Sequence, residues 1–566
     1  MAKVTFVYPA FESLGIGYLS ACLKSAGHKT FLVYDPVIFN DTTIDIPSLS
    51  KLFSYRDKVV KSIVNSRPDL VAFSCVTEDY GWACAIARKI KEISHVPIIF
   101  GGIHPTSVPE AVINEPFVDY LCVGEGEGAL LDLANALDAK SDTTNINNLW
   151  VKLDKGIKIN PSRPLIQDLD ILPFSDKDIF RDVAPNLRYG YIISASRGCL
   201  YSCSYCCHDI LMGIYKEQHY FRSRSVENII KELILAKDKY KIKTVAFCDS
   251  LINFNREWLI HFLKEYIKQI KLPFDCYVHP KGIDEDSVML MKAAGCHHVR
   301  LGVQTTNEKT RKDIFTRYHS NEDVASAIKL FRQYSIFIEC DNIFGLPNQS
   351  VNDIFEMAQF YNENLPSKIQ VLGLRYYPKT KILDILRKLN CFDTSSLNSL
   401  ALPSRKTRPM PSGGDACLKD FSKVKLFFSL LVFLPKKIRA LAIQKRIFNY
   451  LPIGNTYVLN LLYEFFVRPK ISVFITRTYR RYLIFIPKRF INLALFFSRV
   501  PNLYFYVIII SCFSVKPAYG YTDAGISGII FQIGYIIFYI IIASFYSCLK
   551  PFKNFLMLII KKLRKK

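Results

Sequence analysis

Short apolar runs alternate with amphipathic segments along the first 140 residues. Between the apolar runs, residues 14–26, 79–93 and 127–137 repeat apolar positions every three or four residues, as a helix with one buried face does. This alternation predicts a parallel sheet with helices on both faces and a ligand site at the carboxyl ends of its strands. The runs that we read as buried strands are residues 4–9, 30–35, 70–76, 97–102 and 120–124.

The same alternation returns after residue 186. Five helical patterns separate the apolar runs of this region. Six strand–helix units predict an open barrel whose working residues lie in the loops after the strands. The expected strands are residues 190–195, 244–249, 274–279, 298–304, 337–344 and 369–376.

The pattern changes again near residue 396, where apolar blocks begin to alternate with Lys/Arg clusters. Residues 524–549 carry no charge over a length that spans a membrane, and residues 500–515 are uncharged but short. Basic residues flank this pair on the outside, so the positive-inside rule predicts a membrane hairpin with both ends in the cytosol. Peripheral attachment through basic helices and a buried soluble helical region are the alternatives.

These patterns divide the chain into four expected parts. Residues 1–140 and 186–395 form the two α/β domains, and residues 396–566 form a basic, apolar helical tail. Residues 141–185 are expected to be a linker, because four prolines interrupt any helix or central strand there.

Charge is concentrated in the tail. Residues 401–566 hold 27 Lys and Arg against 4 Asp and Glu, so nearly all of the net charge of +24 belongs to them. We expect an anionic membrane as the partner and no nucleic acid, because the basic residues are interleaved with long aliphatic runs. The chain does not open with a signal-peptide pattern, so we expect cytoplasmic catalytic domains attached to the inner face of the cell membrane. Sixteen cysteines in such a chain argue against a disulfide framework.

Three cysteines directly after the first strand of the second α/β region carry the clearest chemistry. Cys199, Cys203 and Cys206 follow the spacing Cys-x3-Cys-x2-Cys. Three thiolates can bind three irons of a cubane cluster, whose full ligand set is four, and leave one iron open for chemistry. A structural zinc site is the alternative, but zinc usually takes Cys-x2-Cys pairs, and no second pair follows at the usual distance.

With Arg197 and Gly198 before it, this loop resembles the signature loop of the radical SAM superfamily. The resemblance implies that the three cysteines hold a [4Fe-4S] cluster and that S-adenosylmethionine (SAM) chelates the open iron. Gln304 and Gln349 stand where the family carries acids, and an amide can still form hydrogen bonds without the charge. The SAM contacts that the resemblance implies are Tyr205, Asp249, Gln304 and Gly345.

Glycine-containing turns end the strands of the first region, and glycine lets the backbone approach a large flat ligand. Together with the cysteine loop, they resemble the Rossmann-like cobalamin-binding domain of the cobalamin-dependent radical SAM subgroup. The motif Asp-x-His-x-x-Gly is absent, so no axial histidine is assigned, and a sheet that no longer binds cobalamin is the alternative. The implied cobalamin contacts are Ser74, Thr77, Gly101, Gly102, His104, Gly124 and Glu125.

The resemblance implies an enzyme in which SAM cleavage gives a 5′-deoxyadenosyl radical that removes hydrogen from an unactivated carbon. Cobalamin would serve methylation, ring closure or rearrangement, and a flavodoxin- or ferredoxin-like protein would donate the electron. An oxygen-sensitive cluster suits an anaerobic setting, and the tail favours a small, lipophilic biosynthetic intermediate as substrate. Two alternatives stay open: a non-catalytic iron–sulfur and cobalamin-binding membrane protein, and a soluble radical SAM enzyme acting on a peptide or polar metabolite.

Overall fold

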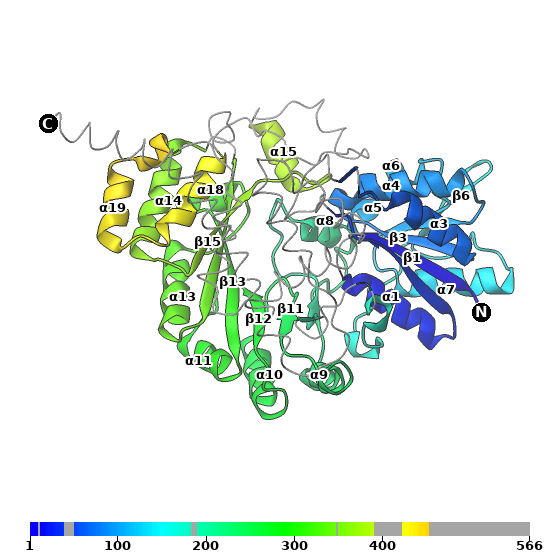
Figure 1. The fold of residues 1–566 in the computed structure, drawn as a ribbon, viewed down its shortest axis with the longest axis horizontal. Helices are drawn as coiled ribbons and strands as arrows, with labels where there is room; N and C mark the ends of the chain where they lie inside the picture. The colour runs from blue at the N-terminus through cyan, green and yellow to red at the C-terminus, as the bar shows by residue number, and fades with distance from the viewer. Residues whose placement is uncertain are drawn as a thin grey trace, which may run out of the picture. The chain divides into compact units, whose positions relative to one another are not determined.

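The computed structural model describes residues 1–9, 12–38, 50, 51, 53–181, 183, 190–346, 349–389 and 421–451. Two β-sheets organise this part of the chain (Figure 1). By its contacts, the chain divides into one compact unit over residues 1–477, which contains both sheets, and a second over residues 478–566.

The first sheet has seven strands in the order β2-β1-β3-β4-β5-β6-β7. Its first five strands are parallel, as the sequence predicts. They are β1 (Lys3–Pro9), β2 (Lys29–Asp35), β3 (Leu70–Ser74), β4 (Ile98–Gly101) and β5 (Tyr120–Cys122).

Helices cover both faces of the first sheet. One hydrophobic core lies between the sheet and α3 (Arg56–Ser66), α4 (Thr77–Lys91) and α6 (Pro109–Ile113). On the other face, α1 (Leu14–Ser25) and α7 (Glu127–Ala139) enclose a second core. The short α5 (Ile103–Ser107) follows β4 directly. The chain therefore has the two-faced α/β layering that the sequence predicts.

The region expected to be a linker contributes more structure than its prolines indicate. Its residues form β6 (Leu149–Leu153) and β7 (Gly156–Ile159), an antiparallel pair that extends the first sheet from β5. Two 3-10 turns follow, η1 (Leu169–Ile171) and η2 (Asp178–Phe180). The sequence analysis missed this hairpin because its strands are short and follow a polar segment.

The second sheet has six parallel strands in the order β15-β14-β13-β12-β11-β8. All six expected strands are confirmed, and in the described residues β8 and β15 form the two edges of an open sheet. They are β8 (Tyr191–Ile193), β11 (Val245–Phe247), β12 (Phe274–Val278), β13 (Cys296–Gln304), β14 (Phe337–Phe344) and β15 (Lys368–Gly373).

Helices pack on the outer face of the second sheet around one large hydrophobic core (Figure 1). These helices are α9 (Val226–Tyr240), α10 (Arg256–Gln269), α11 (Glu285–Ala293), α13 (Asn321–Gln333) and α14 (Val351–Glu363). Smaller elements complete the region: β9 (Ser196–Arg197), β10 (Arg222–Ser223), α8 (Cys207–Ile214), α12 (Glu308–Asp313) and α15 (Lys381–Lys388).

Residues 421–451, the described part of the expected tail, pack on the hydrophobic core of the second sheet. α18 (Phe421–Leu431) buries Val424 and Phe428 in it, and α19 (Lys436–Gln444) and η5 (Ile447–Tyr450) follow. Among the described residues, no helix is both long and apolar enough to cross a membrane. The predicted hairpin, residues 500–515 and 524–549, lies outside the described residues.

A buried ion pair connects the segment after β1, in the first sheet, to β8, in the second. Lys177 is 1% exposed, and its Nζ donates to Glu12 Oε1 at 2.5 Å and to the carbonyl oxygen of Ile192 in β8 at 2.7 Å. The same ammonium group lies 4.9 Å from the centre of the Tyr191 ring. Because both charges are almost completely removed from water, each depends on the other for compensation.

Replacing Lys177 should therefore destabilise the protein strongly. In Lys177→Met the Glu12 carboxylate stays buried without its cation, and we expect a loss of about 3–5 kcal/mol in the free energy of unfolding. Urea-induced unfolding of the full chain measures this loss. The double variant Glu12→Gln/Lys177→Met should recover most of it, and equal losses in the single and double variants would contradict a role for the unpaired charge.

Candidate active site

The three cysteines lie in the loop that follows β8, at the carboxyl edge of the second sheet. Cys199 and Cys203 are buried, and Cys206 is half-buried. Gly198 enters the loop with φ +90°, and a Cβ there would lie 2.5 Å from the carbonyl oxygen of Tyr220. The backbone of the loop thus passes so close to its neighbour that only glycine fits at this position.

Asp249 holds the lead-in of the cysteine loop. Its carboxylate accepts hydrogen bonds from the Ala195 N–H at 2.9 and 3.0 Å and from the Ser196 hydroxyl at 2.5 Å. Burial raises the pKa of Asp249, although these hydrogen bonds oppose the rise. The sequence predicts that Asp249 contacts the amino group of SAM. In the structure its oxygens are used for positioning the loop, and a SAM contact would have to share them.

Residues 314–317, which follow α12, form hydrogen bonds and ring contacts with the cysteine loop. The Thr316 hydroxyl donates to the carbonyl oxygen of Ser202 at 3.0 Å, and the Ser204 hydroxyl donates to that of Ile314 at 2.5 Å. The Tyr205 ring packs edge-on against Phe315, with ring centres 4.8 Å apart. Tyr205, an implied SAM contact, therefore also has a packing role that fixes the loop.

Arg317 reaches the cysteines and was missed by the sequence analysis. Its Nη1 donates to Cys203 Sγ at 3.5 Å and its Nη2 donates to the carbonyl oxygen of Gly302 at 2.8 Å. Burial lowers the pKa of Arg317, but the neighbouring Tyr205 and Cys203 more than compensate and raise it, so the guanidinium stays charged. A fixed positive charge beside thiols favours their thiolate form, which binds iron. In the sequence, Arg317 sits in a charged turn that has no distinguishing pattern.

Buried polar atoms without a hydrogen-bond partner in the described residues gather near the cysteine loop. They include Gln304 Oε1 at the end of β13, Arg317 Nε, His279 Nε2 after β12, and both ring nitrogens of His319. His279 stacks on Tyr201 of the cysteine loop at 4.1 Å and lies 5.4 Å from His319. A buried polar atom left unpaired costs free energy, so a polar ligand that supplies partners fits this edge of the sheet. SAM is such a ligand.

Gln349, one of the two glutamines that stand where the family carries acids, has a structural role. Its Oε1 accepts hydrogen bonds from the N–H groups of Gly345 at 2.8 Å and Leu346 at 3.3 Å. Gly345, with φ +78°, begins this turn directly after β14. A carboxylate oxygen would accept the same two hydrogen bonds, so the amide preserves the turn that an acid would form.

Two of the three cysteine thiols have a pKa raised by their surroundings. Burial raises the pKa of Cys199, and contact with the Cys207 thiol together with burial raises that of Cys206. Iron binding must therefore release protons. In the described residues no three His, Cys, Asp or Glu side chains converge on one metal ion. A cubane cluster does not require such convergence, because each thiolate binds a different iron.

A cavity of about 350 Å³ lies at the carboxyl ends of β1, β3, β4 and β5. Five of the seven predicted cobalamin contacts line it: Ser74, Gly101, Gly102, Gly124 and Glu125. Its opposite wall comes from the lead-in to the cysteine loop and the segment after it, Ser194, Ser196, Arg197 and Arg224. A corrinoid is much larger than this cavity, so the cavity fits one part of cobalamin rather than the whole molecule.

Thr77 and His104, the other two predicted contacts, lie beside the cavity. His104 Nδ1 and Thr77 Oγ1 are 3.1 Å apart, and the imidazole packs against the Tyr80 ring at 4.3 Å. Burial lowers the pKa of His104 to about 4, so the ring is neutral at pH 7. His104 thus shapes the loop after β4, and its Nε2 is a buried atom without a partner in the described residues.

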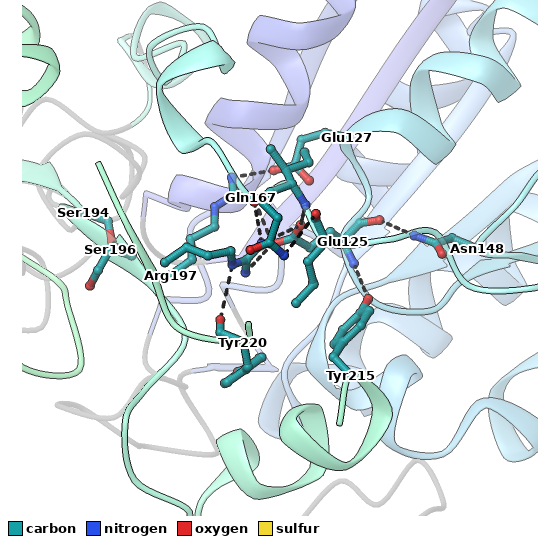
Figure 2. A network of polar contacts seen from close by, with 12 residues as sticks. Glu125, Glu127, Asn148, Gln167, Ser194, Ser196, Arg197, Tyr215 and Tyr220 are labelled. Carbon is teal, nitrogen blue, oxygen red and sulfur yellow. Dashed lines mark hydrogen bonds and ion pairs between the residues drawn. The ribbon is translucent and has the colours of Figure 1, made fainter. Parts of the chain in front are cut away.

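Four charged side chains join the cavity to the cysteine loop, and we call them the Glu–Arg clamp: Glu125, Glu127, Arg197 and Arg222. Figure 2 shows Arg197 beside Glu125 and Glu127, with Nη2 at 2.6 Å from Glu127 and Nη1 at 3.3 Å from Glu125. Arg222 binds both oxygens of Glu125, at 2.9 and 3.1 Å. Burial alone would raise the pKa of Glu125, but the two arginines lower it.

The inner face of the second sheet is polar, whereas its outer face is the hydrophobic core. Arg300 donates to the Tyr277 hydroxyl at 2.6 Å, and Glu339 pairs with Lys368 at 3.0 Å. The backbone of Asp341 pairs with β13 and β15, whereas its carboxylate makes no hydrogen bond or ion pair within the described residues. Burial and the charge of Glu339 raise the pKa of Asp341 to about 7. This carboxyl group was not among the predicted site residues, since a single Asp within an apolar strand gives no motif.

Family comparisons agree with this arrangement of sites. Residues 193–361 match the model of the radical SAM superfamily, and residues 4–134 match that of the B12 binding domain. The first match contains the cysteine loop and the second contains the glycine turns of the cavity. Together they cover the two regions in which the sequence predicts these domains.

Several curated relatives and solved structures are similar to this chain. An uncharacterized methyltransferase of Pyrococcus horikoshii is 25% identical, in a match that covers 67% of this chain and 82% of the relative. An anaerobic magnesium-protoporphyrin IX monomethyl ester cyclase of Rubrivivax gelatinosus is also 25% identical, over 64% of this chain and 66% of the relative. The structure of the methyltransferase TsrM from Kitasatospora setae with cobalamin and a [4Fe-4S] cluster aligns with a TM-score of 0.56 at 17% identity.

That alignment covers 70% of this chain and 76% of TsrM, and it shows a shared fold. The radical SAM model implies a [4Fe-4S] cluster and SAM as cofactors, and the B12 binding model implies cobalamin. The chain therefore belongs to the radical SAM superfamily, as a cobalamin-dependent radical SAM enzyme that carries a B12-binding domain ahead of its radical SAM domain.

Proposed function

We propose that this enzyme modifies an unactivated carbon of a small molecule, by methylation or ring closure. The observation that carries the proposal is that one segment serves both sites: Ser194, Ser196 and Arg197 line the cavity and lead directly into Cys199. The part of cobalamin that the cavity holds would thereby lie next to the cysteine loop. The methyltransferases and cyclases among the relatives support these two reaction types.

Each group of residues has a distinct role in this proposal. Cys199, Cys203 and Cys206 bind the cluster, and Arg317 stabilises their negative charge. SAM binds beside them, where Gln304, His279 and His319 offer polar atoms without partners in the described residues. When bound, the cluster, SAM and cobalamin supply the radical and methyl-transfer chemistry. The protein positions them and keeps water out.

The barrel and the tail favour substrates of different polarity. The apolar blocks of the tail favour a lipophilic molecule and attachment to the membrane. The inner face of the barrel, with Asp341 and Arg300, favours a substrate that carries a polar or ionised group near its reacting carbon. We therefore propose an amphiphilic biosynthetic intermediate, whose polar end enters the barrel.

The domain limits follow the sequence prediction, with one extension. We propose a cobalamin-binding domain over residues 1–140, to which β6 and β7 are added, a radical SAM core over residues 186–395, and a membrane-attached tail that starts beyond α19. An electron donor of the flavodoxin or ferredoxin type would reduce the cluster. The non-catalytic alternative is less favoured, because Gln349 keeps the turn that an acid would form.

Cleavage of SAM should depend on the three cysteines. The protein is reconstituted anaerobically with iron, sulfide and hydroxocobalamin, and 5′-deoxyadenosine is quantified after addition of SAM and a strong reductant. We expect Cys206→Ala to lower the product to the level of cluster-free protein, because the cluster loses a ligand. The matched control Cys207→Ala should keep it, and equal product from both variants would contradict the ligand assignment.

A methyl group at Gly102 should disturb the cavity. Gly102 has φ +99°, and a Cβ there would lie 2.7 Å from the carbonyl oxygen of Cys75. We expect Gly102→Ala to destabilise the protein by more than the roughly 1–2 kcal/mol of left-handed strain and to weaken hydroxocobalamin binding in an absorbance titration. Gly27→Ala is the control, because Gly27 has φ +86° and no atom within 4 Å of its Cβ position. Equal cobalamin affinity in both variants would argue against the cavity as the corrinoid site.

Membrane attachment should reside in the last compact unit. We expect deletion of residues 478–566 to lower binding to phosphatidylglycerol vesicles by at least about tenfold, because it removes 13 of the 27 Lys and Arg residues in 401–566. Co-sedimentation with vesicles measures this. α18 must be retained, since its Val424 and Phe428 complete the core of the second sheet. Iron content equal to that of the full chain is the control for folding, and unchanged sedimentation would contradict a membrane role for these residues.

A further inference from the structure

The Glu–Arg clamp connects the loop that lines the cavity to the strand that enters the cysteine loop. Glu125 is on the cavity wall, and its carboxylate binds Arg222 through two hydrogen bonds and Arg197 through a longer contact. Its backbone is held as well. The Asn148 side chain donates to its carbonyl oxygen at 2.7 Å, and its N–H donates to the Tyr215 hydroxyl at 3.3 Å (Figure 2). The position of Glu125 is therefore fixed from several sides.

The arginines of the clamp lie on opposite strands of the small β9–β10 ribbon. Arg197 and Arg222 are paired residues in its register, so both side chains reach the same carboxylate from neighbouring backbones. Arg197 is separated from Cys199 only by Gly198, whose backbone is packed against Tyr220. A shift of Arg197 is then expected to move Cys199, because the single residue between them is packed and cannot absorb the displacement.

The charges of the clamp are balanced and largely removed from water. Arg222 and Glu127 are 6% and 8% exposed, so each needs its partner to remain stable. Arg222 does not line the cavity, whereas Glu125, Glu127 and Arg197 do. A ligand that touches Glu125 therefore acts on Arg222 and Arg197 through this network. A change at Arg222 reaches the cavity through Glu125 and through its strand partner Arg197.

We propose that Glu125 and Glu127 are positioning residues through which cobalamin binding and cluster binding are energetically coupled. This inference rests on the proposed function, since it takes the cavity as the corrinoid site and the cysteine loop as the cluster site. A corrinoid that contacts Glu125 would further stabilise this arrangement of the clamp, and the clamp holds Arg197 and Cys199 in the position that the cluster needs. Coupling of this kind is reciprocal, so the cluster must raise the affinity for cobalamin by the same factor.

Hydroxocobalamin titrations test the coupling without any turnover. The dissociation constant is measured by absorbance for cluster-free and reconstituted protein, and the ratio of the two constants is the coupling factor. In the wild-type chain we expect a ratio of about 5–150, the range typical of coupled sites. In Arg222→Gln it should fall toward about one, because Glu125 loses its bidentate partner.

Arg163→Gln is the matched control. Arg163 pairs with Asp132 of α7 and does not line the cavity, so Arg163→Gln should keep the wild-type ratio. Arg222→Lys provides a second variant that keeps the charge, and it should show an intermediate ratio since the fork geometry is lost. The electron paramagnetic resonance spectrum of the reduced cluster gives an independent readout. Excess reductant converts the added hydroxocobalamin to its paramagnetic Co(II) form, so that signal is subtracted. The remaining cluster signal should then change on cobalamin addition in the wild type but not in Arg222→Gln.

The outcomes separate the coupling from the proposed function. Wild-type protein that binds both cofactors with a ratio near one overturns the coupling and leaves the proposed function intact. A ratio that stays at the wild-type value in Arg222→Gln also overturns it. Wild-type protein that binds no hydroxocobalamin overturns both proposals.

Discussion

Burial of charge where the two sheets meet is the constraint on which the active site depends. The cavity of the first sheet and the cysteine loop of the second share a wall. The Glu–Arg clamp, three of whose four residues line that wall, contains two carboxylates and two guanidinium groups. Removing such groups from water costs several kcal/mol per ion unless each finds a partner in good geometry. The bidentate contact of Arg222 with Glu125 meets that requirement and at the same time fixes the distance between the two sites.

The same physical requirement explains why some predicted contacts have other roles. Asp249 is nearly fully buried, so its carboxylate takes the nearest donors, which are the backbone of Ala195 and the hydroxyl of Ser196. These bonds set the direction in which the chain leaves β8. The Asp249 carboxylate therefore positions the loop that carries the cysteines, and its contact with SAM stays a prediction.

The sequence could predict those features that depend on period and spacing. Buried parallel strands are continuous apolar runs, so all six strands of the barrel and the first five of the other sheet were located. The spacing of Cys199, Cys203 and Cys206 is itself a ligand pattern. In contrast, Arg317 and the Glu–Arg clamp depend on contacts between residues about 70 to 115 positions apart, and no local pattern encodes such contacts.

The two faces of the second sheet have different roles: the outer face packs in the core, and the inner face carries charged side chains. Along β14, Ile338 and Cys340 point into the hydrophobic core, and Glu339 and Asp341 alternate with them on the other face. The outer face is a packing surface and is insensitive to the substrate. On the inner face, Glu339 forms ion pairs with Lys368 and Arg300. The same two cations lower the pKa of Asp341, but by less than burial and Glu339 raise it. A carboxyl group whose pKa lies near neutrality can bind a cationic or hydrogen-bond-donating group, or exchange a proton with it, with little change in free energy. The polar specificity of this enzyme is therefore expected to reside in a few inward-facing residues of the second sheet.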